Sequence, residues 1–120
     1  MAKTSDSEFN AGTCDELLQL FGRDGVIEML EALQRDLPQQ RRHLIEASAR
    51  EDRPSLKRIA HNLRGAALQF GAEPLAQHCA DIEQSVAGDV PTSRIVADAE
   101  QMLDRYAALL SRLKESRYGA

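Results

Sequence analysis

Residues 54–72 read PSLKRIAHNLRGAALQFGA, and this stretch decides the fold. When the chain is turned by about 100° per residue, as in an α-helix, the apolar residues of this stretch fall on one side. These residues are Leu56, Ile59, Leu63, Ala66, Ala67 and Phe70. The pattern predicts an amphipathic helix that ends near Gly71 and buries one face in a core.

His61 points away from this apolar face. A histidine on the polar side of a well-patterned helix contributes nothing evident to packing, so we treat it as a candidate functional residue. Arg64 and Gly65 follow three and four positions later and border it on the same surface. Glycine inside a helix costs roughly 1 kcal/mol relative to alanine. We interpret Gly65 as a residue that gives a bulky group access to the imidazole.

The segment AHNLRGAALQFGAEPLAQHCADIE, residues 60–83, resembles the signature of the histidine-containing phosphotransfer (Hpt) domain family. That signature reads A-H-x-L-K-G, then two small residues, then G-A, L, C and E at set distances. The matching positions are Ala60, His61, Leu63, Gly65, Ala66, Ala67, Gly71, Ala72, Leu75, Cys79 and Glu83. Weaker similarity extends over nearly the whole chain.

The resemblance implies that His61 accepts a phosphoryl group from the aspartate of a receiver domain and passes it to another receiver. It also implies that the partners are response-regulator receiver domains or a hybrid histidine kinase. Arg64 stands where the family usually has lysine, and its positive charge could balance that of the phosphate. In some members a glutamate at the position of Glu83 pairs with Nδ1 of the histidine. Glu83 is therefore the candidate residue that orients the imidazole and leaves Nε2 to react.

Basic and apolar side chains near His61 are candidates for docking a partner. Lys57 and Arg53 are expected on the His61 side and Arg58 on the opposite flank, which would form a basic collar that complements an acidic receiver. Leu68 is an exposed leucine at the next turn, where the family more often has a small residue. The predicted docking residues are Lys57, Arg58, Leu68 and Gln69.

Composition limits the class of protein. The chain has 120 residues, few aromatic residues and no tryptophan, which predicts one domain with an aliphatic core. Its net charge of −4 argues against general nucleic-acid binding, and no apolar segment is long enough to span a bilayer. Cys14 and Cys79 lie far apart and lack metal-ligand spacing, so we expect a cytoplasmic protein whose cysteines are reduced. We also expect a monomer. We expect no cofactor or metal of its own, since Mg²⁺ and catalysis would come from the receiver, and we predict a phosphocarrier that is not an enzyme.

The N-terminal part is expected to be a flexible tail over residues 1–12, followed by one domain over residues 13–117. A short helix, TCDELLQLF, would begin at a cap formed by Thr13 or Asp15 and would end at Gly22. Its apolar residues would cover the end of the bundle. They are Leu17, Leu18, Leu20 and Phe21.

Three further helices follow from the same periodicity. One begins at Asp24 and should bend at Pro38 without breaking, one begins at Glu73, and the last is capped by Thr92 or Ser93. The tail from Glu115 is expected to fray. Each helix has one apolar face, which predicts an all-α, antiparallel, up-down-up-down four-helix bundle with an additional short N-terminal helix.

Three alternative functions compete with phosphotransfer. A di-iron bundle needs Glu-x-x-His pairs, and no histidine here has a glutamate three positions before it. A sensor-kinase dimerisation domain normally has an acidic residue and a proline soon after its histidine, and an ATP-binding domain after it, which are absent from this sequence. An adaptor bundle that binds a response regulator without transferring phosphate is the alternative that the sequence excludes least well.

Overall fold

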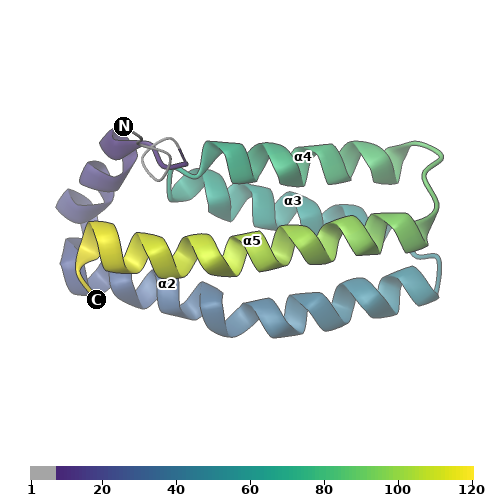
Figure 1. The fold of residues 1–120 in the computed structure, drawn as a ribbon, viewed down its shortest axis with the longest axis horizontal. Coiled ribbons are helices and arrows are strands. Elements are labelled where there is room, and N and C mark those ends of the chain that lie inside the picture. Colours follow the sequence, from purple (N-terminus) through teal and green to yellow (C-terminus); the bar gives the residue numbers. More distant parts are fainter. Residues whose placement is uncertain (1–7) are drawn as a thin grey trace.

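The computed structural model describes residues 8–120, and all the regular secondary structure in that range is helical. Four helices follow one another along the chain: α2 (Ala11–Ala49), α3 (Arg53–Gln69), α4 (Glu73–Ala87) and α5 (Thr92–Tyr118). They extend along one long axis, and short loops join them at the two ends (Figure 1). The predicted all-α class is confirmed for the described residues.

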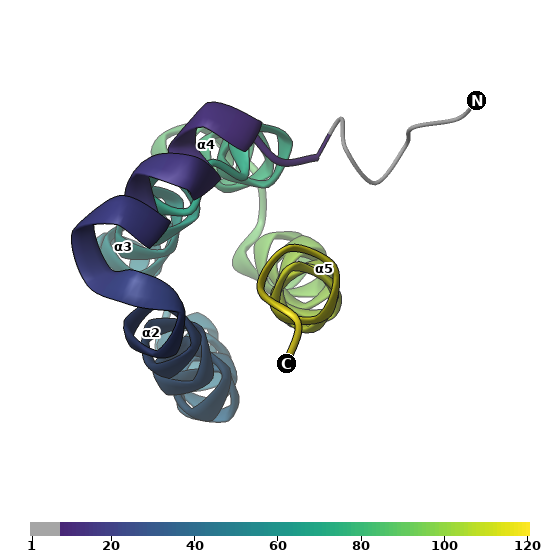
Figure 2. The same cartoon turned by 90° about the vertical axis from the view of Figure 1, so that its left-hand side faces the viewer.

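The chain changes direction within α2 at Gly22. This residue has φ 73° and ψ 166°, a conformation that glycine adopts without steric cost. The helical segment before it, residues 11–21, crosses the ends of α3 and α4 (Figure 2). We refer to this segment as the N-terminal arm. Gly22 is also the residue at which a separate short helix was predicted to end.

The N-terminal arm begins earlier than predicted. Asn10 is the N-cap residue, and its side-chain oxygen accepts a hydrogen bond from the backbone N–H of Thr13 at 3.0 Å. The prediction that Thr13 or Asp15 caps this helix is therefore wrong. The reason is that both residues already lie inside the helix, which starts at Ala11.

Ordered contacts also begin inside the tail predicted for residues 1–12. The backbone N–H of Asn10 donates to the carbonyl of Gly71 at 2.8 Å, which fastens the start of the arm to the loop between α3 and α4. The rest of that predicted tail, residues 1–7, lies outside the described residues.

Only part of the arm's apolar side covers the bundle. Leu17 is buried and Leu18 packs partly against the core, whereas Leu20 and Phe21 are 73% and 51% exposed. The prediction that all four residues cover the end of the bundle is wrong for the last two. The chain turns at Gly22 immediately after them, so they extend past the surface that the other two cover.

α2 continues through Pro38 as far as Ala49, so the prediction that this proline does not break the helix is confirmed. Leu37 and Leu44, on either side of the proline, are both buried. The apolar stripe therefore keeps its phase across a residue that lacks a backbone N–H.

The starts of α4 and α5 show one correct and one wrong prediction. α4 begins at Glu73 as predicted. Neither Thr92 nor Ser93 caps α5, because Pro91 occupies the cap position. Thr92 is instead buried, and its hydroxyl donates to the carbonyl of Ser48 at 3.4 Å and to the Glu51 carboxylate at 3.1 Å. Its side chain joins the start of α5 to the end of α2.

The end of α5 is held by other parts of the chain. Tyr118 is buried and donates through its hydroxyl to the carbonyl of Cys14 at 3.3 Å. Arg23 donates to the carbonyls of Tyr118 and Gly119, at 2.6 and 2.8 Å. The prediction that the chain frays from Glu115 is therefore wrong, because α5 continues to Tyr118.

Each helix packs against two others: α2 against α3 and α5, and α4 against α3 and α5. α3 and α5 are consequently diagonal neighbours, and Figure 2 shows α5 on the opposite side of the bundle from α3. One side of α3 therefore faces away from the rest of the molecule. None of the helices among residues 8–120 has the length and apolar character needed to cross a bilayer.

Candidate functional site

His61 lies in the middle of α3, on the side that faces away from the bundle. Leu56, Ile59 and Leu63 on the same helix are buried, as the apolar pattern requires. The side chain of His61 is 61% exposed. Its ring therefore meets solvent directly, while the opposite face of α3 holds the helix in the core.

The ring of His61 contacts a carboxylate on the neighbouring helix. Its Nδ1 atom lies 3.2 Å from Oε1 of Glu83 in α4, and the Glu83 side chain is only 12% exposed. Because a carboxylate accepts hydrogen bonds, this contact favours the tautomer that carries its proton on Nδ1. Nε2 then keeps a free lone pair. No hydrogen bond to that atom is found among residues 8–120.

Arg64 also turns toward Glu83. Its Nη1 atom lies 3.5 Å from Oε2 of the carboxylate, and its side chain is 38% exposed. His61 and Arg64 therefore share one carboxylate, each at its own oxygen. The three predicted residues form a continuous polar group across the seam between α3 and α4.

The surface beside the imidazole is open. A Cβ atom added to Gly65 would meet no atom of the described part of the chain within 4 Å, so packing there does not require a glycine. Leu68, further along α3, is 48% exposed. It lines a groove of about 270 Å³ between α3 and α4. The lining residues are Arg64, Leu68, Glu73, Ala76, Gln77 and Ala80.

The other predicted docking residues are distributed around the exposed side of α3. Lys57 and Gln69 are exposed, before and after His61. Arg58 is also exposed, and it donates to the hydroxyl of Ser55 at 3.1 Å. It lines a polar groove between α2 and α3, so it belongs to the α2 flank of the site.

The expectation that Arg53 faces the His61 side is wrong. Its guanidinium donates to backbone carbonyls at the end of α4 and in the loop after it, at distances from 2.8 to 3.2 Å. These carbonyls belong to Ser85, Val86, Gly88 and Val90. The last carbonyls of a helix have no partners within it, and a guanidinium can satisfy several at once.

A family model described as the Hpt domain matches residues 28–116. The chain belongs to the Hpt domain family. The match includes His61, Arg64 and Glu83, and it confirms the family that the sequence resembled. Hpt domains act in histidine phosphotransfer in two-component signalling, as phosphocarriers that interact with receiver domains and histidine kinases. No curated protein and no solved structure matches the chain.

Two buried side chains of this Hpt domain lie close to the site but were not among the predicted site residues. Cys79 is fully buried one turn before Glu83. Burial, with a smaller contribution from the Glu83 charge, raises the pKa of its thiol to about 12, so the thiol stays neutral. The hydroxyl of Tyr106 in α5 donates to the carbonyl of Leu63 at 2.9 Å, and burial raises the pKa of this tyrosine. The sequence signal was a tyrosine inside the last predicted helix, because a tyrosine hydroxyl that becomes buried requires a hydrogen-bond partner.

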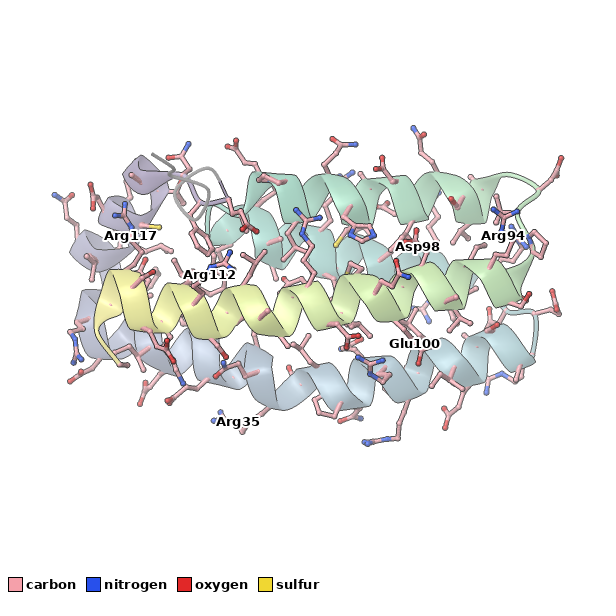
Figure 3. The ribbon with its side chains drawn as sticks, in the orientation of Figure 1. Arg35, Arg94, Asp98, Glu100, Arg112 and Arg117 are labelled. Carbon is pink, nitrogen blue, oxygen red and sulfur yellow. The ribbon has the colours of Figure 1, made fainter. Side chains whose placement is uncertain are left out.

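The other two histidines of the Hpt domain lie elsewhere. His78 in α4 contacts Asp98 at 3.1 Å and Arg105 at 3.3 Å, both on α5, and Asp98 is labelled in Figure 3 between α5 and α4. His43 lines the groove between α2 and α3. Within residues 8–120, no group of three or more His, Cys, Asp or Glu side chains is arranged to hold a metal ion.

Proposed function

We propose that this Hpt domain is an intermediate of a phosphorelay, in which Nε2 of His61 accepts a phosphoryl group from a receiver-domain aspartate and passes it to another receiver. The observation that carries this proposal is the 61% exposed imidazole whose Nδ1 lies 3.2 Å from a nearly buried carboxylate. An imidazole held in this way presents one nitrogen to a partner, and that nitrogen is unprotonated when the ring is neutral.

The bonds, electron pairs and protons of the transfer step can all be accounted for with the imidazole, Glu83 and the phosphorylated aspartate. The Nε2 lone pair attacks phosphorus, an N–P bond forms, and the P–O bond to the aspartate breaks, with its electron pair remaining on the aspartate carboxylate. The Nδ1 proton stays in place, so the ring of the phosphohistidine carries a positive charge that the Glu83 carboxylate offsets at 3.2 Å. In the return step the imidazole leaves as a neutral group because Nδ1 has kept its proton.

The residues around His61 fit a histidine that carries a phosphoryl group between partner proteins. Gly65 leaves the approach to the ring open, and Arg64 adds positive charge one turn away. We propose that Lys57, Arg58, Leu68 and Gln69 contact the receiver. We also propose that the receiver supplies Mg²⁺ and most of the stabilisation of the transition state, and that this chain contributes no cofactor and is not itself an enzyme.

We further propose that the helices form an antiparallel, up-down-up-down bundle that acts as a monomer in the cytoplasm, with the arm as an additional helix. Short loops at alternate ends and the order of neighbouring helices support the arrangement. Two free, buried cysteines suit a reducing compartment.

Phosphoryl transfer from each ³²P-labelled receiver domain encoded in the source genome tests the proposal. Wild type and a His61→Gln variant are compared, with His43→Gln as the matched control at another exposed histidine. We expect wild type and His43→Gln to acquire acid-labile phosphate from at least one receiver and His61→Gln to acquire none. Uptake by His61→Gln would refute the proposal. If wild type binds a receiver stably but takes up no phosphate, the result would favour the alternative of an adaptor bundle that does not transfer phosphate.

A further inference from the structure

The N-terminal arm is joined to the rest of α2 through one non-helical residue, Gly22. Its φ of 73° and ψ of 166° define a conformation that is open to glycine but costly for other residues. A change of backbone angles at such a residue can turn a whole segment, as it does at hinges. The family match begins at residue 28, so the arm and this glycine lie outside the matched part of the chain.

Little of the arm's surface is buried. Cys14 and Leu17 reach the core and Leu18 packs partly against it, whereas Leu20 and Phe21, next to Gly22, are exposed. Burial of apolar surface is the main source of tertiary stability. A segment that buries little of it can therefore separate at a lower free energy than unfolding of the whole chain requires.

Polar contacts with α5 help to keep the arm in place. The hydroxyl of Tyr118 donates to the carbonyl of Cys14 at 3.3 Å, and Arg112 donates to the carboxylate of Glu8, just before the arm. The Nε atom of Arg112 is buried and has no hydrogen-bond partner among residues 8–120. A buried donor without an acceptor is costly, and departure of the arm would release Glu8 and Arg112 to water.

The start of the arm lies against the turn between α3 and α4. The backbone N–H of Asn10 donates to the carbonyl of Gly71 at 2.8 Å, and a Cβ added to Gly71 would lie 3.0 Å from the Cβ of Thr13. Phe70 and Ala72, on either side of this glycine, are buried. The arm therefore covers an apolar end of the bundle (Figure 2).

We propose that the N-terminal arm is a hinged strap, which opens as a unit about Gly22 while the rest of α2 and the other three helices stay folded, and which thereby controls access to the apolar end of the bundle at the α3–α4 turn. Opening withdraws Cys14 and Leu17 from the core and breaks the hydrogen bonds that Tyr118 and Asn10 donate. The strap needs no partner, and it does not depend on the proposed phosphotransfer.

The two cysteines report on this motion. Cys14 is a buried, free thiol in the arm, and Cys79 is a buried, free thiol in α4. Initial rates of alkylation of the full chain by iodoacetamide, assigned to each cysteine by mass spectrometry, are divided by the rates of the same thiols in urea-unfolded protein. We expect the normalised rate of Cys14 to exceed that of Cys79 by about tenfold or more, because Cys79 requires global unfolding.

Two glycine substitutions test the hinge. An added Cβ would meet no described atom within 4 Å at either Gly22 or Gly65, but Gly22 has a φ of 73° and Gly65 lies in a helix. Alanine at position 22 favours helical angles, which would continue α2 straight into the arm and carry the arm off the bundle. Gly22→Ala should raise the Cys14 rate by about tenfold and leave Cys79 unchanged. Gly65→Ala, the matched control, should not change the Cys14 rate.

Two tyrosine substitutions test the fastening. Tyr118 and Tyr106 are both buried in α5 and each donates to a backbone carbonyl, one to Cys14 in the arm and the other to Leu63 in α3. Tyr118→Phe should raise the Cys14 rate about fivefold and leave Cys79 unchanged, because it removes one hydrogen bond of the closed arm. Tyr106→Phe should do the reverse, since it weakens the bundle and leaves the arm's contacts intact.

Equal normalised rates for the two thiols of wild type would overturn the strap, because they would show that the arm leaves the bundle only when the whole chain unfolds. The strap is also refuted if Gly22→Ala leaves Cys14 unchanged, or if Tyr118→Phe raises both rates by the same factor. Circular dichroism checks that each variant is folded. Phosphoryl uptake is not measured, so failure of the proposed relay would leave this result unaffected.

Discussion

Gly65 is the residue at which helix stability and the proposed function conflict. It lies inside α3, where glycine is less favourable than alanine, yet nothing among residues 8–120 occupies the space that a side chain would fill. A more stable residue would therefore fit the fold. The open space lies one turn after His61, on the surface that a phosphorylated receiver would approach in the proposed relay.

Replacing Gly65 with alanine should stabilise the protein while slowing phosphotransfer. We expect the free energy of unfolding in urea to rise by about 1 kcal/mol, because alanine has the higher helix propensity. The initial rate of phosphoryl uptake from the receiver should fall, and Gly65→Gln should slow it further. Uptake at the wild-type rate in both variants would contradict the role in access.

At the scale of helices, two arginines satisfy helix ends that lie far from them in sequence. Arg23 donates to the last carbonyls of α5, and Arg53 donates to those of α4 and the loop after it. Both side chains bring a positive charge to the negative end of a helix dipole. They join elements through backbone groups, so neither contact depends on the identity of the partner side chain.

Arg53→Ala should lower the free energy of unfolding by on the order of 2 kcal/mol, because it leaves several carbonyls at the end of α4 without their donor. Arg53→Lys should recover only part of this loss, since an ammonium cannot span carbonyls as a planar guanidinium does. Chemical denaturation measures both. Arg94→Ala, at an exposed arginine near the start of α5 (Figure 3), is the control and should change stability little.

Asp52 gives α3 a pH-dependent cap. Hydrogen bonds from the side chain and the backbone of Ser55 lower the pKa of its carboxyl, so the folded state favours the ionised form. A lowered pKa stabilises the fold above the unfolded value, near pH 4, and this contribution is lost as pH falls through the folded value. Asp52→Ala should therefore be less stable than wild type at pH 7, and the difference should shrink below about pH 4. A constant difference between pH 7 and pH 3 in urea titrations would contradict this.

At the scale of the whole molecule, Tyr106 links the two diagonal helices. Its hydroxyl crosses the core from α5 to the carbonyl of Leu63 in α3, two residues after His61. Tyr106→Phe should lower the free energy of unfolding by about 1 kcal/mol, the usual net value of one buried hydrogen bond. Phosphoryl uptake should be unchanged, because the bond lies on the core side of α3. Reduced uptake by a folded Tyr106→Phe protein would show that this link also positions the site.

Charge is unevenly distributed over the molecule. The chain carries a net charge of −4, yet α3 contains four basic residues and no acidic one. Arg53 and Arg64 are engaged with α4, whereas Lys57 and Arg58 remain exposed near His61. A positive surface on an acidic protein favours an acidic partner and orients it during encounter.

Much of the fold and the central residue of the site could be predicted from local patterns. The 3.6-residue period placed His61 opposite Leu56, Ile59 and Leu63, and the structure exposes the first and buries the others. The helical period determines in which direction each side chain points about the helix axis. Which residues of α3 are buried and which are exposed can therefore be predicted without knowledge of the other helices. The starts and ends of helices were predicted less well, since Asn10, Thr92 and Tyr118 make contacts with distant segments.

The sequence by itself determined four amphipathic helices, the outward direction of His61 and the family to which the chain belongs. Only the tertiary structure decided that Arg64 turns to Glu83, that Arg53 caps α4 and that Thr92 joins α5 to α2. The physical reason is that periodicity does not specify the axial register between two helices. Long polar side chains adopt the rotamer that meets an unpaired charge or carbonyl, and those partners are brought near only when the helices pack.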